Sequence, residues 1–433
     1  LGYGKGNKIT ISEELHFPHS LGLLYSAFTA FLGFKVNEGE YKVMGMAPYG
    51  KPKYVDKVLK VVKISDDGSL ELDLSYFTFT HSTKKTFSKK FVELFGEPRV
   101  PETPFFTEEF EIPSYYEKID GSLNKLKEKN QYYADIAASI QYVAEDIILK
   151  MAKNLYKKTG IKNLCYAGGV ALNSKANYRL LKETEFENVF IQPAATDAGG
   201  ALGAALWVWH QLFDKKEKQV LEHAYLGKGF SYDEIKNSIE EKNLRYQELS
   251  DEKIYQKLVE ALKNGKVIGW YQGRCEWGPR ALGNRSILAD PRNPKMKEIV
   301  NVKIKFREPF RPFAPSVLEE DIKEIFDIDK EQYPHRFMLM THMVKDEKRK
   351  IIPAVTHVDG SSRLQSVKKK YNPRYWQLLN HFKKETGVGV VLNTSFNLRG
   401  EPIVNSPKDA IKTFLNSGID ILVLENFLIE KIT

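Results

Sequence analysis

Apolar residues recur at helical spacing in several stretches of the chain. In residues 21–34 they fall three or four positions apart, which predicts an amphipathic helix. The same spacing extends over residues 132–159, and Gly160 follows directly, so a long helix is expected to end there. Residues 42–50 contain two glycines and a proline and favour a loop instead.

Short apolar stretches alternate with helical ones in the remainder of the sequence. Strands are predicted over residues 163–167, 189–192 and 267–272. Helices are predicted over residues 173–183, 198–210, 232–242, 253–264 and 296–303, and a last α/β segment runs from residue 372 to the end. The irregular residues 51–130 predict an insertion with short strands. The alternation of strands, Gly-rich turns and helices is typical of an α/β (α+β) fold.

The length of 433 residues exceeds what one hydrophobic core usually organises, so two domains are expected. A charged, weakly patterned segment separates the two structured halves. The prediction is a first domain over residues 1–222, a linker over 223–250 and a second domain over 251–433. Because Leu1 and its neighbours read like the interior of a domain, we expect the first domain to be truncated at its N-terminus.

Composition restricts the classes of partner and the compartment. The net charge of +9 comes from lysines scattered along the chain, and no basic run is interleaved with aromatic residues. We therefore expect no nucleic acid partner. No apolar stretch is long enough for a bilayer, and the two cysteines, Cys165 and Cys275, lie far apart without metal-ligand spacing. Without a signal-peptide pattern, the sequence favours a cytoplasmic protein with no membrane partner.

Two glycine-rich turns in the first half are candidate nucleotide sites. Gly168 and Gly169 lie between a predicted strand and a predicted helix, where a phosphate could approach the backbone and the helix N-terminus. A plain structural turn explains the same glycines. Asp197 opens a second glycine-rich helix, either as a cap or as a ligand for a metal that neutralises phosphate oxygens.

Arginines concentrate in two segments of the second half. Residues 269–286 contain Arg274, Arg280 and Arg285, and residues 303–315 add Arg307 and Arg311. Glycine, proline and aromatic residues surround them, whereas a solvated charged surface would be rich in Glu and Gln. The pattern favours bidentate recognition of phosphate or carbamate oxygens.

Two further segments present polar side chains after apolar residues. In the run from Asn393 through Ser395 to Asn397, alternate residues share one face if the strand continues. A hairpin turn is the alternative explanation. Residues 359–365 form a predicted turn that presents Arg363.

Several of these strings together resemble the NodU/CmcH family of carbamoyltransferases, which acts on Nod factors, cephalosporins and aminoglycosides. They are HFPHSLGLLYS (16–26), GEYKVMGMAPYG (39–50), GGVALN (168–173), WGPRALGNRS (277–286) and NTSFN (393–397). The resemblance runs in order from Phe17 to the C-terminus.

The resemblance implies a partial Kae1-like domain of the actin and sugar-kinase type, followed by a YrdC-like α/β domain. In such enzymes the YrdC-like domain makes carbamoyl-adenylate from carbamoyl phosphate and ATP, and the Kae1-like domain passes the carbamoyl group to a hydroxyl. Residues with an implied role in adenylate formation are Lys305, Arg307, Arg280 and Arg311. Implied ligands of carbamoyl phosphate or nucleotide are Arg363, Asn393, Ser395, Asn397, Gly168, Gly169, Asn173 and Gly199.

The family's Kae1-like domain also binds a divalent metal, Fe or Mg, and Asp197 is the implied ligand. The His-x-x-x-His pair that accompanies this metal in the family is absent, since His16 and His19 are three positions apart. The expected acceptor is a hydroxyl of a saccharide or small molecule, and the expected assembly is a homodimer. Alternative interpretations are a threonylcarbamoyl-adenylate or tRNA-modifying enzyme and a catalytically idle nucleotide-binding scaffold.

Overall fold

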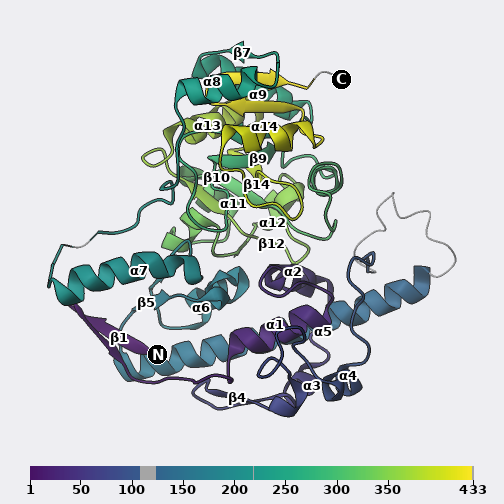
Figure 1. The fold of residues 1–433 in the computed structure, drawn as a ribbon, viewed down its shortest axis with the longest axis vertical. Coiled ribbons are helices and arrows are strands. Elements are labelled where there is room, and N and C mark those ends of the chain that lie inside the picture. The colour runs from purple at the N-terminus through teal and green to yellow at the C-terminus, as the bar shows by residue number, and fades with distance from the viewer. Residues whose placement is uncertain (108–122, 218, 432–433) are drawn as a thin grey trace. The chain divides into compact units, whose positions relative to one another are not determined.

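The computed structural model describes residues 1–107, 123–217 and 219–431 (Figure 1). The chain divides into two compact units. Unit 1 comprises Leu1–Phe190 and Gly199–Lys218, and unit 2 comprises Ile191–Ala198 and Gln219–Thr433. Both cysteines are free thiols.

Unit 1 is built on one long helix, α5 (Leu123–Thr159), which carries the helices α1 (Leu21–Phe31), α2 (Glu40–Met46), α3 (Val55–Val58) and α6 (Ser174–Glu183) (Figure 1). The predicted helices over residues 21–34 and 132–159 are confirmed. Helix α5 begins nine residues before the predicted start, because its first turns are polar and show no apolar spacing.

The loop predicted over residues 42–50 is wrong, because α2 and a 3₁₀ turn (Ala47–Tyr49) occupy that segment. Residues such as Glu40, Lys42 and Met44 favour helix. Gly45 is buried within α2, and Pro48 lies in the first turn of the 3₁₀ helix, where its missing N–H costs nothing. Neither residue therefore breaks the helix.

The predicted insertion over residues 51–130 contributes to the core of unit 1. Its strands β3 (Val62–Ile64) and β4 (Leu70–Leu72) form an antiparallel pair. The helix α4 (Lys89–Phe95) brings Phe91 and Phe95 against Phe28, with ring centroids 5.1 Å apart in both pairs. Part of the segment, residues 108–122, lies outside the described residues.

The remaining elements of unit 1 follow the predicted alternation of strands and helices. Strand β5 (Asn163–Tyr166) pairs with β6 (Asn188–Ile191), and α6 connects them. Helix α7 (Gly200–Trp207) continues into a π-helical turn (Val208–Leu212). An antiparallel hairpin, β1 (Gly2–Lys5) and β2 (Lys8–Ile11), opens the chain.

Unit 2 contains one eight-stranded mixed sheet with the order β13-β10-β14-β9-β8-β15-β16-β7. The strands are β7 (Gln247–Glu248), β8 (Ile268–Tyr271), β9 (Arg285–Ala289), β10 (Ala314–Leu318), β13 (Gln365–Val367), β14 (Val390–Ser395), β15 (Ile421–Leu424) and β16 (Phe427–Glu430). Shorter elements are α10 (Met296–Ile299), α11 (Ile322–Ile325), α12 (Asp346–Arg349), β11 (His342–Met343) and β12 (Ser361–Ser362).

Helices cover both faces of this sheet, so the strands at its centre, such as β8 and β15, are buried along their whole length. On β14, Val391 packs with α9 (Asp251–Lys263) and α13 (Pro373–Thr386). Its neighbours Val390 and Leu392 point to the opposite face, with α8 (Tyr232–Glu240) and α14 (Pro407–Leu415). The predicted α/β class is confirmed as a mixed α/β architecture.

The segment 223–250, predicted as a linker, contains α8 and β7. Ile235 and Ile239 of α8 are buried in the core of unit 2, so the segment is part of this unit's structure. The assignments to Kae1-like and YrdC-like domains stay predictions.

Four segments that are distant in sequence meet where β14 ends and its neighbouring strands begin, a place called here the sheet edge. The last residue of β14, Ser395, pairs with Ser286 at the start of β9. Strand β10 starts beside Asn393, and β13 starts beside Ser316 of β10. The loops that enter β9, β10 and β13 therefore meet the loop that leaves β14. These loops contain the arginines singled out in the sequence.

Within the described ranges, no helix has both the length and the apolar character needed to cross a membrane. Helix α5 is long enough, but charged residues recur along it.

Gly283, in the loop before β9, cannot accept a side chain. Its φ is +103°, and an added Cβ would lie 2.2 Å from the ring of the buried Tyr375. We predict that Gly283→Ala lowers the free energy of unfolding by about 3 kcal/mol, through backbone strain and overpacking. Gly387→Ala is the control, because its φ is +77° but nothing lies within 4 Å; it should cost about 1 kcal/mol. Equal losses in urea unfolding would contradict the packing argument.

Candidate functional site

Five cationic side chains gather at the sheet edge of unit 2 and are here called the cationic cluster: Arg280, Lys305, Arg307, Arg311 and Arg363. Their charges act on one another. Burial, and then the charges of the cluster's three other arginines, hold the pKa of Arg363 well below its ordinary value. Burial also lowers the pKa of Lys305, and the charges of Arg307 and Arg311 add to that effect. The structure thus brings together all five predicted cations.

Lys305 links the cluster to the end of β14. Its side chain is buried, and Nζ donates to the backbone oxygen of Asn397 at 2.9 Å and to Ser395 Oγ at 3.2 Å. Nζ also donates to the Ser395 carbonyl and to Asn397 Oδ1. Lys305 follows a π-helical turn (Val300–Ile304), and Phe306 has a positive φ of 48°, which turns the chain sharply. Lys305 and the segment from Ser395 to Asn397 are therefore direct partners in the structure.

Asn301 holds the two arginines that follow. Its Oδ1 accepts a hydrogen bond of 2.7 Å from Arg307 Nε, and its Nδ2 donates to the Arg311 carbonyl at 2.9 Å. Asn301 is fully buried. The Arg307 guanidinium also lies over the ring of Phe313, 4.8 Å from its centroid. Arg307 is thereby oriented before any ligand arrives.

The positive charges of Arg363 and Arg311 differ in their partners. Among the residues that the structure describes, Arg363 forms no hydrogen bond or ion pair, although it is half-buried. Arg311 lies 3.6 Å from the Glu308 carboxylate. A guanidinium that is removed from bulk water without a carboxylate partner is well suited to an anionic ligand.

The polar residues at the end of β14 divide into two groups. Asn397 Oδ1 accepts from Ser395 Oγ at 2.8 Å, and both contact Lys305. Asn393 instead lies in the core of the sheet, 1% exposed. Its Nδ2 donates to Ser316 Oγ at 2.9 Å and to the Ala281 carbonyl at 3.2 Å. Asn393 supports the loop that carries Arg280, and a ligand role for it stays a prediction.

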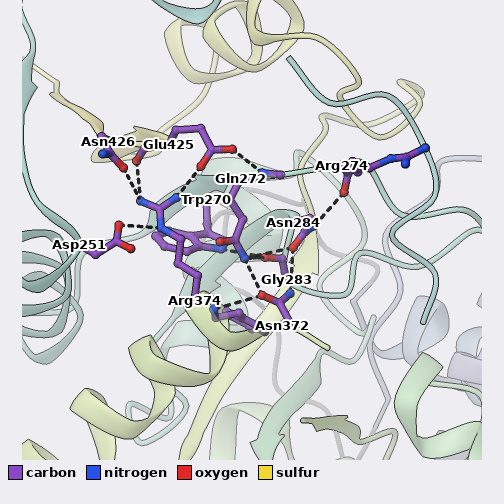
Figure 2. A network of polar contacts seen from close by, with 12 residues as sticks. Asp251, Trp270, Gln272, Arg274, Gly283, Asn284, Asn372, Arg374, Glu425 and Asn426 are labelled. Carbon is purple, nitrogen blue, oxygen red and sulfur yellow. Dashed lines mark hydrogen bonds and ion pairs between the residues drawn. The ribbon is translucent and has the colours of Figure 1, made fainter. Parts of the chain in front are cut away.

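Two further arginines of the same segments have structural partners. Arg285 is fully buried, lies over the Tyr271 ring, and donates to the carbonyls of Gln272 and Gly273. Arg274 donates to the carbonyls of Leu226 and Gly227. Figure 2 shows the Arg274 side chain pointing away from the network around Asn284. The arginine-rich pattern did not separate these two arginines from those of the cluster, whereas the family resemblance assigned a role to neither of them.

The predicted nucleotide residues of unit 1 lie around β5 and α6. Gly168 has a φ of +100°, and a Cβ added at Gly168 or Gly169 would meet nothing within 4 Å. Asn173 caps α6 by accepting from the Ala176 N–H at 3.2 Å, and its Nδ2 donates to Gln141 at 3.1 Å. The turn at Gly168 and Gly169 is therefore open, whereas the Asn173 side chain is already engaged.

Asp197 and Gly199 lie in a short 3₁₀ turn (Asp197–Gly199) before α7, and Asp197 is exposed. Across the described residues, no three His, Cys, Asp or Glu side chains are arranged to hold a metal ion. A metal-ligand role for Asp197 stays a prediction.

The sequence interpretation missed two residues that organise the cluster, Asn301 and Glu276. Glu276 Oε1 accepts from the backbone N–H groups of Leu282 and Asn284, both at 2.7 Å, in the loop that carries Arg280. A polar residue between two valines was the available signal for Asn301. Glu276 stands inside the arginine-rich motif, where its charge was overlooked beside the arginines.

The fold and the cationic cluster define an α/β protein with several cations gathered in unit 2, a charge pattern that suits an anionic ligand. Two family models match the chain, the carbamoyltransferase C-terminus over residues 259–431 and the carbamoyltransferase N-terminus over residues 1–206. The chain belongs to the carbamoyltransferase family.

Relatives support this membership and the predicted NodU/CmcH resemblance. The chain is 46% identical to an uncharacterised Synechocystis protein, over 99% of this chain and 70% of that protein. It is 38% identical to nodulation protein NolNO of Sinorhizobium fredii, over 100% of this chain and 59% of the relative. It is 35% identical to the 3'-hydroxymethylcephem-O-carbamoyltransferase of Amycolatopsis lactamdurans, over 60% of this chain and 47% of that enzyme. The chain thus spans only part of the length of each of these relatives.

The lowered pKa of Lys305 predicts how anion binding depends on pH. An anion favours the protonated amine, and burial makes Lys305 lose its proton at a lower pH than an ordinary lysine. Affinity for sulfate, whose charge does not change at neutral or alkaline pH, should therefore fall as rising pH removes that proton, at a lower pH than an ordinary lysine would require. Calorimetric titration measures it. Lys305→Met should bind sulfate more weakly and lose this slope, whereas an equal slope in both proteins would contradict the assignment.

Proposed function

We propose that this chain carries the catalytic machinery of an O-carbamoyltransferase that uses ATP and carbamoyl phosphate and acts on a hydroxyl of a saccharide or small molecule. Unit 2 would form carbamoyl-adenylate, and unit 1 would take part in transfer to the acceptor. Family membership supports carbamoyl transfer. The cationic cluster is the observation that supports an anionic, phosphate-bearing co-substrate.

In the first reaction, hydrolysis of carbamoyl phosphate yields carbamate and inorganic phosphate. A carbamate oxygen then attacks the α-phosphorus of ATP, and pyrophosphate leaves. Negative charge on the phosphate oxygens must be balanced in both steps, and fixed guanidinium groups do so without reorganising at the moment of reaction. Arg280, Arg307, Arg311 and Arg363 are assigned to the phosphate oxygens.

Lys305 has a different part in this proposal. Its ammonium group contacts the Ser395–Asn397 loop and adds a positive charge beside Arg307 and Arg311. It therefore fixes this loop while it contributes to the potential that attracts the anion. Ser395 and Asn397 are assigned to the same ligand through the polar atoms of that loop.

In the second reaction, the acceptor hydroxyl oxygen attacks the carbamoyl carbon, AMP leaves, and the hydroxyl proton is removed. The open turn at Gly168 and Gly169 supports an adenylate-binding role for unit 1, since its backbone is accessible to a phosphate. Asn173 and Gly199 are assigned to the same site on the family resemblance. The relatives named as 3'-hydroxymethylcephem-O-carbamoyltransferases act on a small-molecule hydroxyl, which supports an acceptor of that chemical class.

Exchange of labelled pyrophosphate into ATP, dependent on carbamoyl phosphate, tests the adenylate-forming reaction. We predict that the wild-type chain catalyses exchange and that Lys305→Ala and Arg307→Ala each reduce its rate by about 100-fold or more, because each removes a positive charge from the cationic cluster. Lys303→Ala is the matched control. Lys303 is exposed two residues before Lys305, and its removal should leave the rate unchanged.

The outcomes also separate the alternatives. A folded wild type that binds ATP but shows no exchange would overturn adenylate formation and favour the nucleotide-binding scaffold. Exchange that requires threonine and bicarbonate instead of carbamoyl phosphate would favour the threonylcarbamoyl-adenylate alternative.

A further inference from the structure

We propose that Glu276 is a positioning residue, which fixes the loop 277–284 and thereby aims Arg280 at the phosphate of the bound substrate. The inference rests on the proposed function, because Arg280 is taken to contact that phosphate. Glu276 itself contacts backbone groups and has no assigned chemical step.

Glu276 is a buried carboxylate that is compensated by backbone dipoles. It is 7% exposed, and Oε1 accepts hydrogen bonds from the N–H groups of Leu282 at 2.7 Å, Asn284 at 2.7 Å and Arg285 at 3.2 Å. In the part of the chain that the structure describes, it forms no ion pair. A buried charge that is held only by convergent N–H groups requires those groups to stay in place.

The loop depends on such contacts, because it contains neither helix nor strand. Side chains from the surrounding core hold its carbonyl groups as well. The Leu282 carbonyl accepts from Gln365 Nε2 at 2.8 Å and from Tyr225 OH at 2.9 Å. The Gly283 carbonyl accepts from Trp270 Nε1 and Gln272 Nε2, both at 2.8 Å (Figure 2). Glu276 completes this arrangement, because it accepts from the backbone N–H groups of the same loop.

The negative charge of Glu276, and not only its shape, holds the loop in place. Hydrogen bonds to a carboxylate are about twice as strong as those to a neutral acceptor, and one oxygen here serves three donors. Replacing the carboxylate with an amide keeps the volume and weakens all three bonds. Since Arg280 lies two residues before Leu282, a loosened loop would displace its guanidinium. A misplacement of about 1 Å is enough to reduce the rate of a reaction about 100-fold.

A double-mutant cycle between Glu276 and Arg280 tests the inference. Wild type, Glu276→Gln, Arg280→Ala and the double variant are titrated with carbamoyl phosphate by calorimetry. We expect Glu276→Gln to raise the Kd about tenfold in the wild-type background and less than about twofold in the Arg280→Ala background. Equal effects in the two backgrounds would overturn the inference, because Glu276 would then act through general stability.

Asp290→Asn is the matched control, since it makes the same change in a buried carboxylate just beyond the other end of β9. Asp290 is 4% exposed and pairs with Arg292 outside the cluster, so its replacement should leave the Kd unchanged. If Glu276→Gln does not fold, Tyr225→Phe weakens the same loop more mildly and should show the same dependence on Arg280, with a smaller change in Kd. Additive effects of Tyr225→Phe and Arg280→Ala would also overturn the inference.

The wild-type titration separates this inference from the proposed function. A wild type that does not bind carbamoyl phosphate overturns both. If the wild type binds carbamoyl phosphate and the effects of Glu276→Gln and Arg280→Ala on Kd are additive, only the positioning role of Glu276 is overturned.

Discussion

Repulsion among the five cations of the cationic cluster is the constraint on which the candidate site depends. Guanidinium groups that share a partly buried volume destabilise one another. Burial, and then the charges of Arg280, Arg307 and Arg311, hold the pKa of Arg363 well below its ordinary value. Glu308 compensates Arg311 in part. The cluster is therefore stable only because the surrounding structure fixes each cation, and an anionic ligand would relieve the repulsion that remains.

The sheet of unit 2 supplies this fixed surrounding. Four segments meet at the sheet edge, and buried polar residues hold two of them: Asn301 for the segment of Arg307 and Arg311, and Asn393 and Glu276 for the loop of Arg280. Other polar groups serve the scaffold alone. In Figure 2, Arg374 bonds to Asp251 and Glu425 and lies 5.1 Å from the Trp270 ring, which ties α9 and α13 to the turn after β15.

The sequence predicted the elements whose signals are local. Apolar spacing predicted α1, α5 and α9, and the strands β5, β6 and β8 were found within one or two residues, because the apolar pattern of each element is visible in its own residues. The family resemblance also joined Lys305 and Arg307 with Ser395 and Asn397, about 90 residues further along the chain.

Features that depend on distant contacts could not be predicted in this way. The helix over 40–46 was missed because Gly45 suggests a loop until its burial is known. The arginine-rich pattern alone does not distinguish Arg285 from Arg280, yet Arg285 opens β9 and is fully buried, whereas Arg280 lies in the loop before this strand. Strand order decides which loops meet, and no local pattern encodes it.

The crystal structure of the protein with carbamoyl phosphate and a non-hydrolysable ATP analogue tests the central claim most directly. The account predicts a phosphate group bound by Arg280, Arg307, Arg311 and Arg363, with the loop 277–284 in the position described above. The claim would be contradicted if the phosphate groups were bound elsewhere in unit 2 and the cationic cluster contacted only solvent.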